Sequence, residues 1–253
     1  METIRSTSGA SIRVPQVDVP GVLLYQVLSG SNAYGLSNST SDADWRGIFQ
    51  VPTDELFRFK PPPQAVKLED DQTYWELTHF ARQCLVGNPN ILELLWVDRS
   101  FVAVSSPVAE AFRDMREHFF SSTIVERYLG WTRDERFIMA PSFKGKRNKR
   151  TPTTVADWDV AHLAGKRGSH MVRMLMSLRS ALRDGRLVVT TTGADRDTLL
   201  SIKAGHVPPE CVVSMADTLY RECEALAAQR NWPMHDPGPV EALLRKARLG
   251  QMG

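Results

Sequence analysis

The stretch from residue 22 to residue 51, VLLYQVLSGSNAYGLSNSTSDADWRGIFQV, carries most of the information on fold and site. Its first seven residues are apolar and β-branched enough to predict a strand, which the turn-forming residues 29–31 end. A short helix is expected next, and the aromatic and β-branched residues 45–51 predict a second strand. If this strand includes Asp42 and Asp44, their side chains point from one face, because strand side chains alternate with a period of two.

Two carboxylates beside a glycine-containing turn are typical of a site for Mg²⁺ and phosphate. Mg²⁺ prefers one or two carboxylates together with the phosphates of its substrate, and Asp42 and Asp44 offer such a pair. Gly30 lets the backbone approach a phosphate closely, and Ser31 adds a hydroxyl near the N-terminus of the expected helix. The alternative is an ordinary turn or helix cap at the aspartates and a plain turn at the glycine.

A third carboxylate usually completes a site in which two metal ions act together. The acidic cluster Glu69-Asp70-Asp71 follows the next expected strand and is placed to supply it. We expect Asp71 to be this third acid. Glu69 and Asp70 stay open as alternatives, because a shift of one residue in register would exchange them.

The composition is that of a globular chain and selects no particular partner. The 253 residues are enough for one large domain or two modest ones, and 42% hydrophobic and 24% charged residues are ordinary values. A net charge of +2 gives no global field that favours nucleic acid or a membrane surface. Three widely spaced cysteines, Cys84, Cys211 and Cys223, predict reduced thiols. With no signal-peptide pattern and no long apolar run, we expect a cytoplasmic protein without a membrane partner.

The pattern of residues changes near residues 100–110. Before that point, residues 65–68 alternate as a third strand would, residues 76–86 predict a helix that Gly87 ends, and Asn88 is expected to cap another helix. Beyond it, helical periodicity dominates, and residues 187–191 are the one stretch with strand-forming residues.

We therefore predict an α+β fold in two parts. Residues 1–105 would form a core with a small mixed sheet and flanking helices. Residues 106–253 would form a mainly helical C-terminal domain.

A long amphipathic helix is predicted over residues 166–183. Its core-facing stripe consists of Met171, Met174, Leu175, Leu178 and Leu182. Lys166, His170 and Arg173 lie beside the stripe at i, i+4 and i+7, where they could bind triphosphate oxygens or form a solvated basic face. The densest basic run is residues 144–150. It could contact phosphate or nucleic acid, or it could simply be solvated.

Taken in order, these motifs resemble the nucleotidyltransferase superfamily typified by DNA polymerase beta. Ten residues separate Ser31 from Asp42, and the superfamily combines a Gly-Gly or Gly-Ser turn with Asp-x-Asp or Asp-x-Glu at a similar spacing. The resemblance is closer to a bacterial and phage branch of predicted nucleotidyltransferases, one lineage of which is linked to RNA repair. Its second block is similar to residues 71–96 and its third to residues 166–185.

The resemblance implies an enzyme that moves a nucleoside monophosphate from a nucleoside triphosphate such as ATP to an acceptor hydroxyl and releases pyrophosphate. It implies three catalytic acids that also bind Mg²⁺ or Mn²⁺: Asp42, Asp44 and Asp71. It implies nucleotide contacts from two parts of the chain: Gly30, Ser31, Lys166, His170 and Arg173. The C-terminal domain would thus contribute to nucleotide or substrate binding.

The acceptor stays open at this point. An RNA 3′ end is favoured by the resemblance to the lineage linked to RNA repair. A protein hydroxyl, as in AMPylating enzymes, is the main alternative, and a non-catalytic nucleotide-binding module of the same fold is another.

Overall fold

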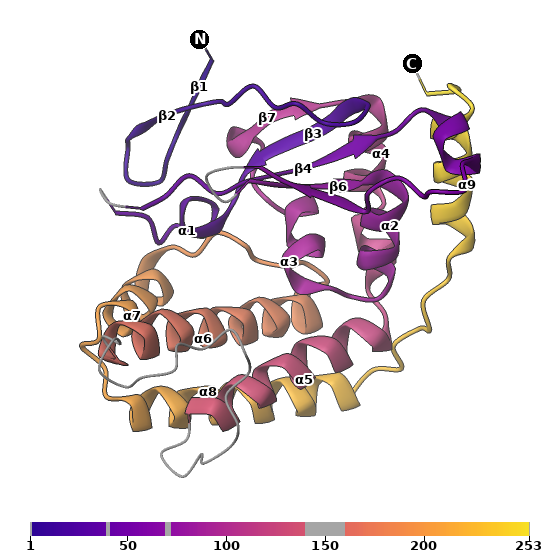
Figure 1. Ribbon diagram of the computed structural model, residues 1–253. Helices are drawn as coiled ribbons and strands as arrows, with labels where there is room; N and C mark the ends of the chain where they lie inside the picture. The colour runs from indigo at the N-terminus through magenta and orange to yellow at the C-terminus, as the bar shows by residue number, and fades with distance from the viewer. Residues whose placement is uncertain (1, 39–40, 69–71, 140–159, 253) are drawn as a thin grey trace. The chain divides into compact units, whose positions relative to one another are not determined.

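The computed structural model describes residues 2–38, 41–68, 72–139 and 160–252 (Figure 1). Packing divides the chain into two compact units. The first comprises Met1–Ile124, Val189–Thr191 and Pro233–Gly253, and the second comprises Val125–Val188 and Thr192–Trp232. The functional division into residues 1–105 and 106–253 stays a prediction. The two packing units have other boundaries, because Val189–Thr191 and Pro233–Gly253 belong to the first unit.

The first unit contains a five-stranded mixed sheet and a separate N-terminal hairpin. The strands are β1 (Thr3–Arg5), β2 (Ser11–Arg13), β3 (Val22–Leu28), β4 (Trp45–Gln50), β5 (Ala65–Lys67), β6 (Thr73–Glu76) and β7 (Val102–Ser105). The sheet has the order β5-β6-β4-β3-β7, while β1 and β2 pair with each other. Among the described strands, β4 and β6 are parallel neighbours and the other pairs are antiparallel.

The first unit contains helices in addition to the sheet. The described part of the second unit consists of helices and their connections. The first unit has α1 (Gly30–Ala33), α2 (Leu77–Leu85), α3 (Pro89–Leu92), α4 (Pro107–Asp114) and α9 (Gly238–Arg248). It also has short 3-10 helices, η1 (Thr53–Phe57), η2 (Glu93–Leu95), η3 (Arg99–Phe101) and η4 (Arg116–Phe119). The second unit has α6 (Val160–Asp184), α7 (Gly193–Lys203), α8 (Pro209–Ala228) and most of α5 (Ser122–Met139). Among the described helices, none has the length and apolar composition needed to cross a membrane.

The structure confirms the α+β class with a small mixed sheet and a helical C-terminal part. The predicted strands correspond to β3, β4 and β5, and Asn88 caps α3 by accepting a hydrogen bond from Asn90 N (3.2 Å). Strands β6 and β7 were not predicted. The strand signal at residues 187–191 was misleading, since these residues form no strand.

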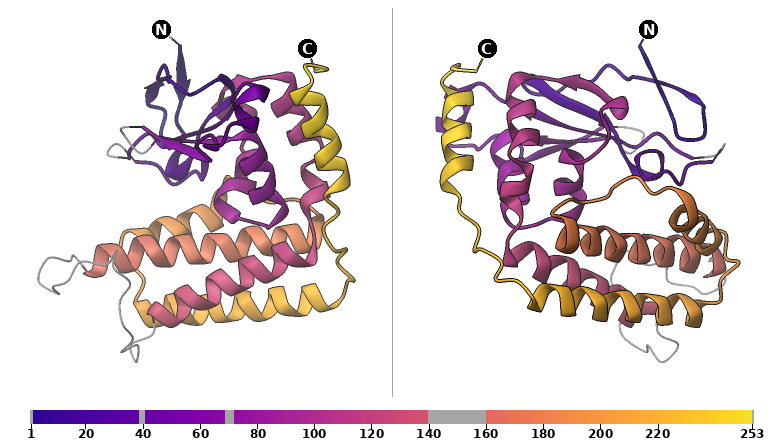
Figure 2. Two further views of the ribbon diagram at one scale, coloured as in Figure 1. Left: turned by 45° about the vertical axis from the view of Figure 1, so that its right-hand side comes forward. Right: turned by 180° about the vertical axis from the view of Figure 1, so that it is seen from behind.

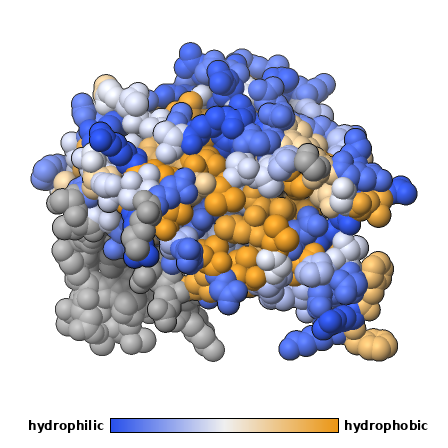
Figure 3. Space-filling view, turned by 90° about the horizontal axis from the view of Figure 1, so that it is seen from above, coloured by the Kyte–Doolittle hydropathy of each residue, from blue (hydrophilic) through white to orange (hydrophobic). Residues whose placement is uncertain are grey.

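The two faces of the sheet are covered by different parts of the chain. Helices α2 and α4 pack on one face, where the rings of Phe80 and Phe112 meet edge to face at 6.0 Å (Figure 2). On the other face, half-buried side chains pack against Phe49, Val51 and Tyr74; they are Val17, Val19, Leu23, Val66 and Leu68. Viewed from above, the molecule shows apolar side chains gathered in the middle of its surface (Figure 3).

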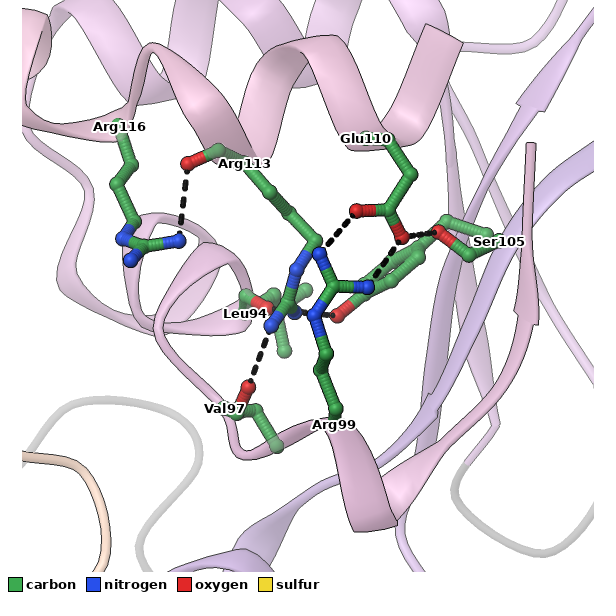
Figure 4. A network of polar contacts seen from close by, with 8 residues as sticks. Leu94, Val97, Arg99, Ser105, Glu110, Arg113 and Arg116 are labelled. Carbon is green, nitrogen blue, oxygen red and sulfur yellow. Dashed lines mark hydrogen bonds and ion pairs between the residues drawn. The ribbon is translucent and has the colours of Figure 1, made fainter. Parts of the chain in front are cut away.

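A buried arginine joins the helical layer to the sheet (Figure 4). Arg113 of α4 donates to the Tyr25 hydroxyl (2.6 Å) and to the carbonyl of Val97 (2.9 Å). Tyr25, in β3, donates in turn to the carbonyl of Leu94 (3.0 Å). Burial raises the pKa of Tyr25 to about 12, so its hydroxyl keeps the proton that it donates. This network holds β3, the strand that leads into Gly30, against the helices.

The second unit has the core that the sequence predicts. The five apolar residues of the expected stripe are all buried on α6: Met171, Met174, Leu175, Leu178 and Leu182. Helix α6 packs on α7 and α8, and the thiol of Cys223 in α8 donates to the carbonyl of Leu175 (3.6 Å). All three cysteines of the chain are free thiols.

The C-terminal helix α9 is tied to the sheet by a buried ion pair. Arg248 pairs with Glu76 at the end of β6 and donates to the carbonyl of Val51 and the hydroxyl of Thr78, both at 2.9 Å. Glu76 also caps α2 by accepting from Thr78 N (2.8 Å). One carboxylate therefore fixes the start of α2 and the end of the chain at once.

We expect Arg248→Met to lower the free energy of unfolding by about 3–5 kcal/mol, because it leaves the Glu76 carboxylate buried without its cation. The double variant Glu76→Gln/Arg248→Met should recover most of this loss, since no buried charge remains. Urea unfolding measures both. Arg245→Ala, an exposed position on the same helix, is the matched control and should change stability by less than about 0.5 kcal/mol. Equal effects of the Arg245 and Arg248 variants would contradict the prediction.

Candidate active site

The pairing of β3 with β4 brings the Gly-Ser turn next to the Asp-x-Asp motif. Leu28, the last residue of β3, pairs with Trp45, the first residue of β4. One step beyond, Ser29 N donates to the carbonyl of Asp44 at 2.7 Å. The chain then turns into α1 at Gly30, so the two motifs meet although the sequence separates them.

Gly30 leaves the space that the Asp44 carboxylate occupies. A Cβ built on Gly30 would overlap Oδ2 of Asp44 and lie 2.7 Å from its carboxyl carbon. The backbone of Gly30 also has φ +61°, a left-handed conformation that glycine adopts without strain. The sequence predicts that Gly30 lets a phosphate approach, and this stays a prediction. The sequence gave no sign that Gly30 also makes room for the Asp44 carboxylate.

The backbone of Asp42 is bound by a side chain from α1. Asn32 is buried, and its Nδ2 donates to the carbonyl of Asp42 at 2.9 Å. The carbonyl of Asn32 accepts from the hydroxyl of Thr7 in the N-terminal hairpin (3.2 Å). Asn32 was not singled out from the sequence, because an asparagine in a turn gives no sign of which carbonyl it will reach.

The two aspartates do not lie within a strand, which corrects the expectation from the sequence. Strand β4 begins at Trp45, and both Asp42 and Asp44 precede it. The Asp42 carbonyl accepts its hydrogen bond from the Asn32 side chain and not from a neighbouring strand. Asp42 is exposed and Asp44 is half-buried.

Arg46 lies beside Asp44 at the start of β4. Its Nη2 is 3.7 Å from Oδ1 of Asp44, and both side chains are about a quarter exposed, at 24% and 25%. A partly exposed ion pair at this distance contributes about 0–1 kcal/mol. This ion pair therefore adds little to the stability of the site. Arg46 was not expected from the sequence to be part of the site. The available signal was its position two residues after Asp44.

The predicted third acid, Asp71, lies outside the described residues, as do Glu69 and Asp70. Strand β6 begins two residues later at Thr73, which pairs with Arg46 of β4 in parallel register. Within the described part of the chain, no three histidine, cysteine, aspartate or glutamate residues gather as a metal site would require. Metal binding by Asp42 and Asp44 stays a prediction.

A segment from after α6 binds the carbonyls at the end of α1. The hydroxyl of Thr190 donates to the carbonyl of Ala33 (2.7 Å). Thr191 donates to the carbonyl of Tyr34 through both its hydroxyl (2.7 Å) and its backbone N (3.0 Å). These bonds satisfy carbonyls that the last turn of a helix leaves without a partner. They explain why Val189–Thr191 belongs to the first unit.

The other predicted nucleotide contacts lie on α6 in the second unit. Lys166 is exposed, His170 is half-buried and Arg173 is buried. Nη2 of Arg173 is 3.4 Å from Nδ1 of His170 and 3.3 Å from Sδ of Met174. The reading of these residues as a solvated basic face is therefore wrong for Arg173, and their contact with nucleotide stays a prediction. The basic run at residues 144–150 lies outside the described residues.

His170 is held in its neutral form. Burial, then the charges of Arg173 and Lys166, lower the pKa of His170 to about 3. Its ring stands edge-on to Trp131, with 5.0 Å between the ring centroids. At neutral pH it is therefore an uncharged hydrogen-bonding group, and it adds no positive charge to a basic face.

The fold and this site define a class. A Gly-Ser turn seated on the second aspartate of an Asp-x-Asp motif, at the ends of the interior strands β3 and β4, is the arrangement of a polymerase beta-type nucleotidyltransferase. The family model of the RNA repair pathway DNA polymerase beta family, RlaP, matches residues 5–241. The chain belongs to this family. No curated protein and no solved structure matches the chain.

We expect Gly30→Ala to lower nucleotidyl transfer by about 100-fold, because the added methyl displaces Asp44 and small displacements of a catalytic group have effects of this size. Gly9→Ala is the matched control: Gly9 has φ +86°, but a Cβ there meets nothing within 4 Å. Both variants carry the backbone strain, about 1 kcal/mol in the free energy of unfolding. Transfer assays and thermal unfolding together test this, and equal activity of the two variants would contradict it.

We expect the ring of His170 to stay neutral far below the usual pKa near 6.5. An unfolded chain takes up this proton near pH 6.5 and the folded chain near pH 3, so stability falls as pH drops through this window. His170→Gln should remove that part of the decline. NMR titration of the histidine rings and unfolding at several pH values measure it, and titration of His170 above pH 6 would refute the assignment.

Proposed function

We propose that the protein is a metal-dependent nucleotidyltransferase that adds a nucleoside monophosphate to the 3′ hydroxyl of RNA. The observation that carries the proposal is the seat of Asp44 on Gly30, which sets a carboxylate of the Asp-x-Asp motif against the Gly-Ser turn. Such a contact serves a site in which carboxylates and a phosphate-binding turn act on the same substrate. The family to which the chain belongs is named for an RNA repair pathway.

The donor set suits Mg²⁺, with Mn²⁺ as the other candidate. Asp42 and Asp44 supply hard carboxylate oxygens, and the exposure of Asp42 leaves it accessible to an ion that arrives with a triphosphate. Bound Mg²⁺ would polarise the α-phosphate and neutralise charge on the departing pyrophosphate. The Asp44–Arg46 ion pair is weak, so a metal ion at Asp44 and a phosphate oxygen at Arg46 could replace it at small cost.

Asp71 is proposed as the acid that orients the acceptor hydroxyl and accepts its proton. Asp71 lies two positions before Thr73 and Asp44 lies two positions before Arg46, and Thr73 and Arg46 are parallel partners. This equality of spacing favours Asp71 over Glu69 and Asp70.

The proposed reaction is an in-line displacement at the α-phosphorus. The acceptor oxygen forms a new bond to that phosphorus as the bond to the β-phosphate oxygen breaks, so the products are a phosphodiester and pyrophosphate. Gly30 and Ser31 would bind the triphosphate, and Lys166, His170 and Arg173 would contact the nucleotide. His170, being neutral, would act there through a hydrogen bond rather than a charge.

We expect Asp42→Asn/Asp44→Asn to lower transfer by about 10²-fold or more, since the variant loses both charges that hold the metal. The assay follows a labelled nucleotide from each of the four triphosphates, with Mg²⁺ or Mn²⁺, onto RNA or onto a protein pool. Asp18→Asn, at an exposed position away from the site in sequence, is the control and should keep full activity.

The outcomes separate the alternatives. Label on protein with none on RNA would replace the RNA acceptor by a protein hydroxyl. Triphosphate binding by calorimetry without transfer to any acceptor would identify a binding module. Full activity of the double aspartate variant would rule out the proposed site.

A further inference from the structure

Two phenylalanines next to the sheet are exposed to solvent. Phe57 ends η1 and is 84% exposed, and Phe59 is fully exposed. They alternate with Arg58 and Lys60, which are exposed as well. Large aromatic side chains bury about 150–250 Å² when they find a partner, so an exposed pair that alternates with cations points to a ligand with flat rings and negative charge.

Helix α9 adds cations to the same region. The hydroxyl of Thr53, at the start of η1, donates to the carbonyl of Arg248 at 2.9 Å, so the C-terminal end of α9 lies beside this segment (Figure 1). Arg245 and Lys246, in the last turns of α9, are exposed. We call the set of Phe57, Arg58, Phe59, Lys60, Arg245 and Lys246 the aromatic-cationic surface.

We propose that the aromatic-cationic surface binds single-stranded RNA, upstream of the 3′ end that receives the nucleotide. The identity of the strand as the acceptor rests on the proposed function. Every base has a face that stacks on an aromatic ring, and Lys and Arg bind the phosphates between bases, so such a surface takes any sequence.

The arrangement favours a single strand over other occupants. Paired bases in a duplex keep their faces stacked on each other and cannot reach the phenylalanines. Protein interfaces are depleted in lysine, whereas this surface includes Lys60 and Lys246. Arg58 pairs with Glu55 at 2.7 Å while 65% of its side chain is exposed, so a phosphate can take this contact at small cost.

Strand β4 sets the separation between this surface and the site. Asp44 immediately precedes β4, and η1 begins three residues after it ends. Six residues of strand span about 20 Å, which corresponds to roughly six nucleotides at helical spacing. The aromatic-cationic surface would therefore contact long acceptors and leave short ones unaffected.

The test is fluorescence anisotropy with a labelled 20-nucleotide single-stranded RNA of mixed sequence and no triphosphate. We expect Phe57→Ala/Phe59→Ala to weaken binding about 10- to 100-fold. Phe57→Leu/Phe59→Leu should weaken it similarly, because leucine keeps the apolar character but cannot stack, whereas Phe57→Trp/Phe59→Trp should preserve it. Met234→Ala, at another exposed apolar side chain (82%), is the control.

Salt dependence tests the cations. We expect Lys60→Ala/Arg245→Ala/Lys246→Ala to reduce the slope of log K against log salt by about 0.7 for each phosphate that the variant no longer binds. Arg186→Ala, an exposed arginine of the second unit, should leave the slope unchanged.

Several results would overturn the proposal. Wild-type affinity in the Ala pair, wild-type affinity in the Leu pair, or equal affinity for duplex RNA would each remove stacking as the cause. Binding to phosphatidylserine vesicles or self-association that depends on the phenylalanines, with RNA binding unchanged, would assign the surface to a membrane or a second copy.

The surface and the proposed reaction can fail separately. In transfer assays, the Ala pair should raise KM for the 20-nucleotide acceptor with kcat unchanged, and should not affect acceptors shorter than about six nucleotides. RNA binding that needs the phenylalanines, without transfer to any acceptor, would retain the surface and refute the reaction.

Discussion

The site depends on one steric constraint, the absence of a side chain at residue 30. Antiparallel pairing of β3 and β4 forces the turn after β3 against the residue before β4, and that residue is Asp44. Only glycine leaves room for the carboxylate and also accepts the left-handed backbone of the turn. Both motifs of the family thus take their positions from a single pair of strands.

The rest of the site is held by polar contacts rather than by regular sheet. Asn32 binds the backbone of Asp42, Thr7 binds Asn32, and Thr190 and Thr191 bind the carbonyls at the end of α1. The partners come from the N-terminal hairpin and from the segment after α6. The stretch from Gly30 to Asp44 is therefore fixed by chain segments far from it in sequence. These contacts account for the four-residue helix α1, which would be unstable alone.

The sequence predicted the elements whose patterns are long or whose chemistry is local. The strand of residues 22–28, the Asn88 cap and the buried stripe of α6 were confirmed, because periodicity and capping need only neighbouring residues. The missed elements depend on distant partners. Residues 187–191 have strand-forming side chains, yet the hydroxyls of Thr190 and Thr191 find carbonyls of α1 and its cap in place of a strand. His170 was placed beside Lys166 and Arg173 as part of a possible basic face, and burial next to Arg173 makes it neutral.

By itself, the sequence determined the α+β class, the order of the motifs and the family, because these depend on residue types and spacing along one chain. The tertiary structure decided which groups meet. It seats Asp44 on Gly30, places Asp42 and Asp44 before the strand, adds Asn32 and Arg46 to the site, and closes Glu76 onto Arg248 at the far end of the chain. Such contacts depend on the strand register and on side chains that reach across the fold, which the spacing of residues in a sequence does not specify.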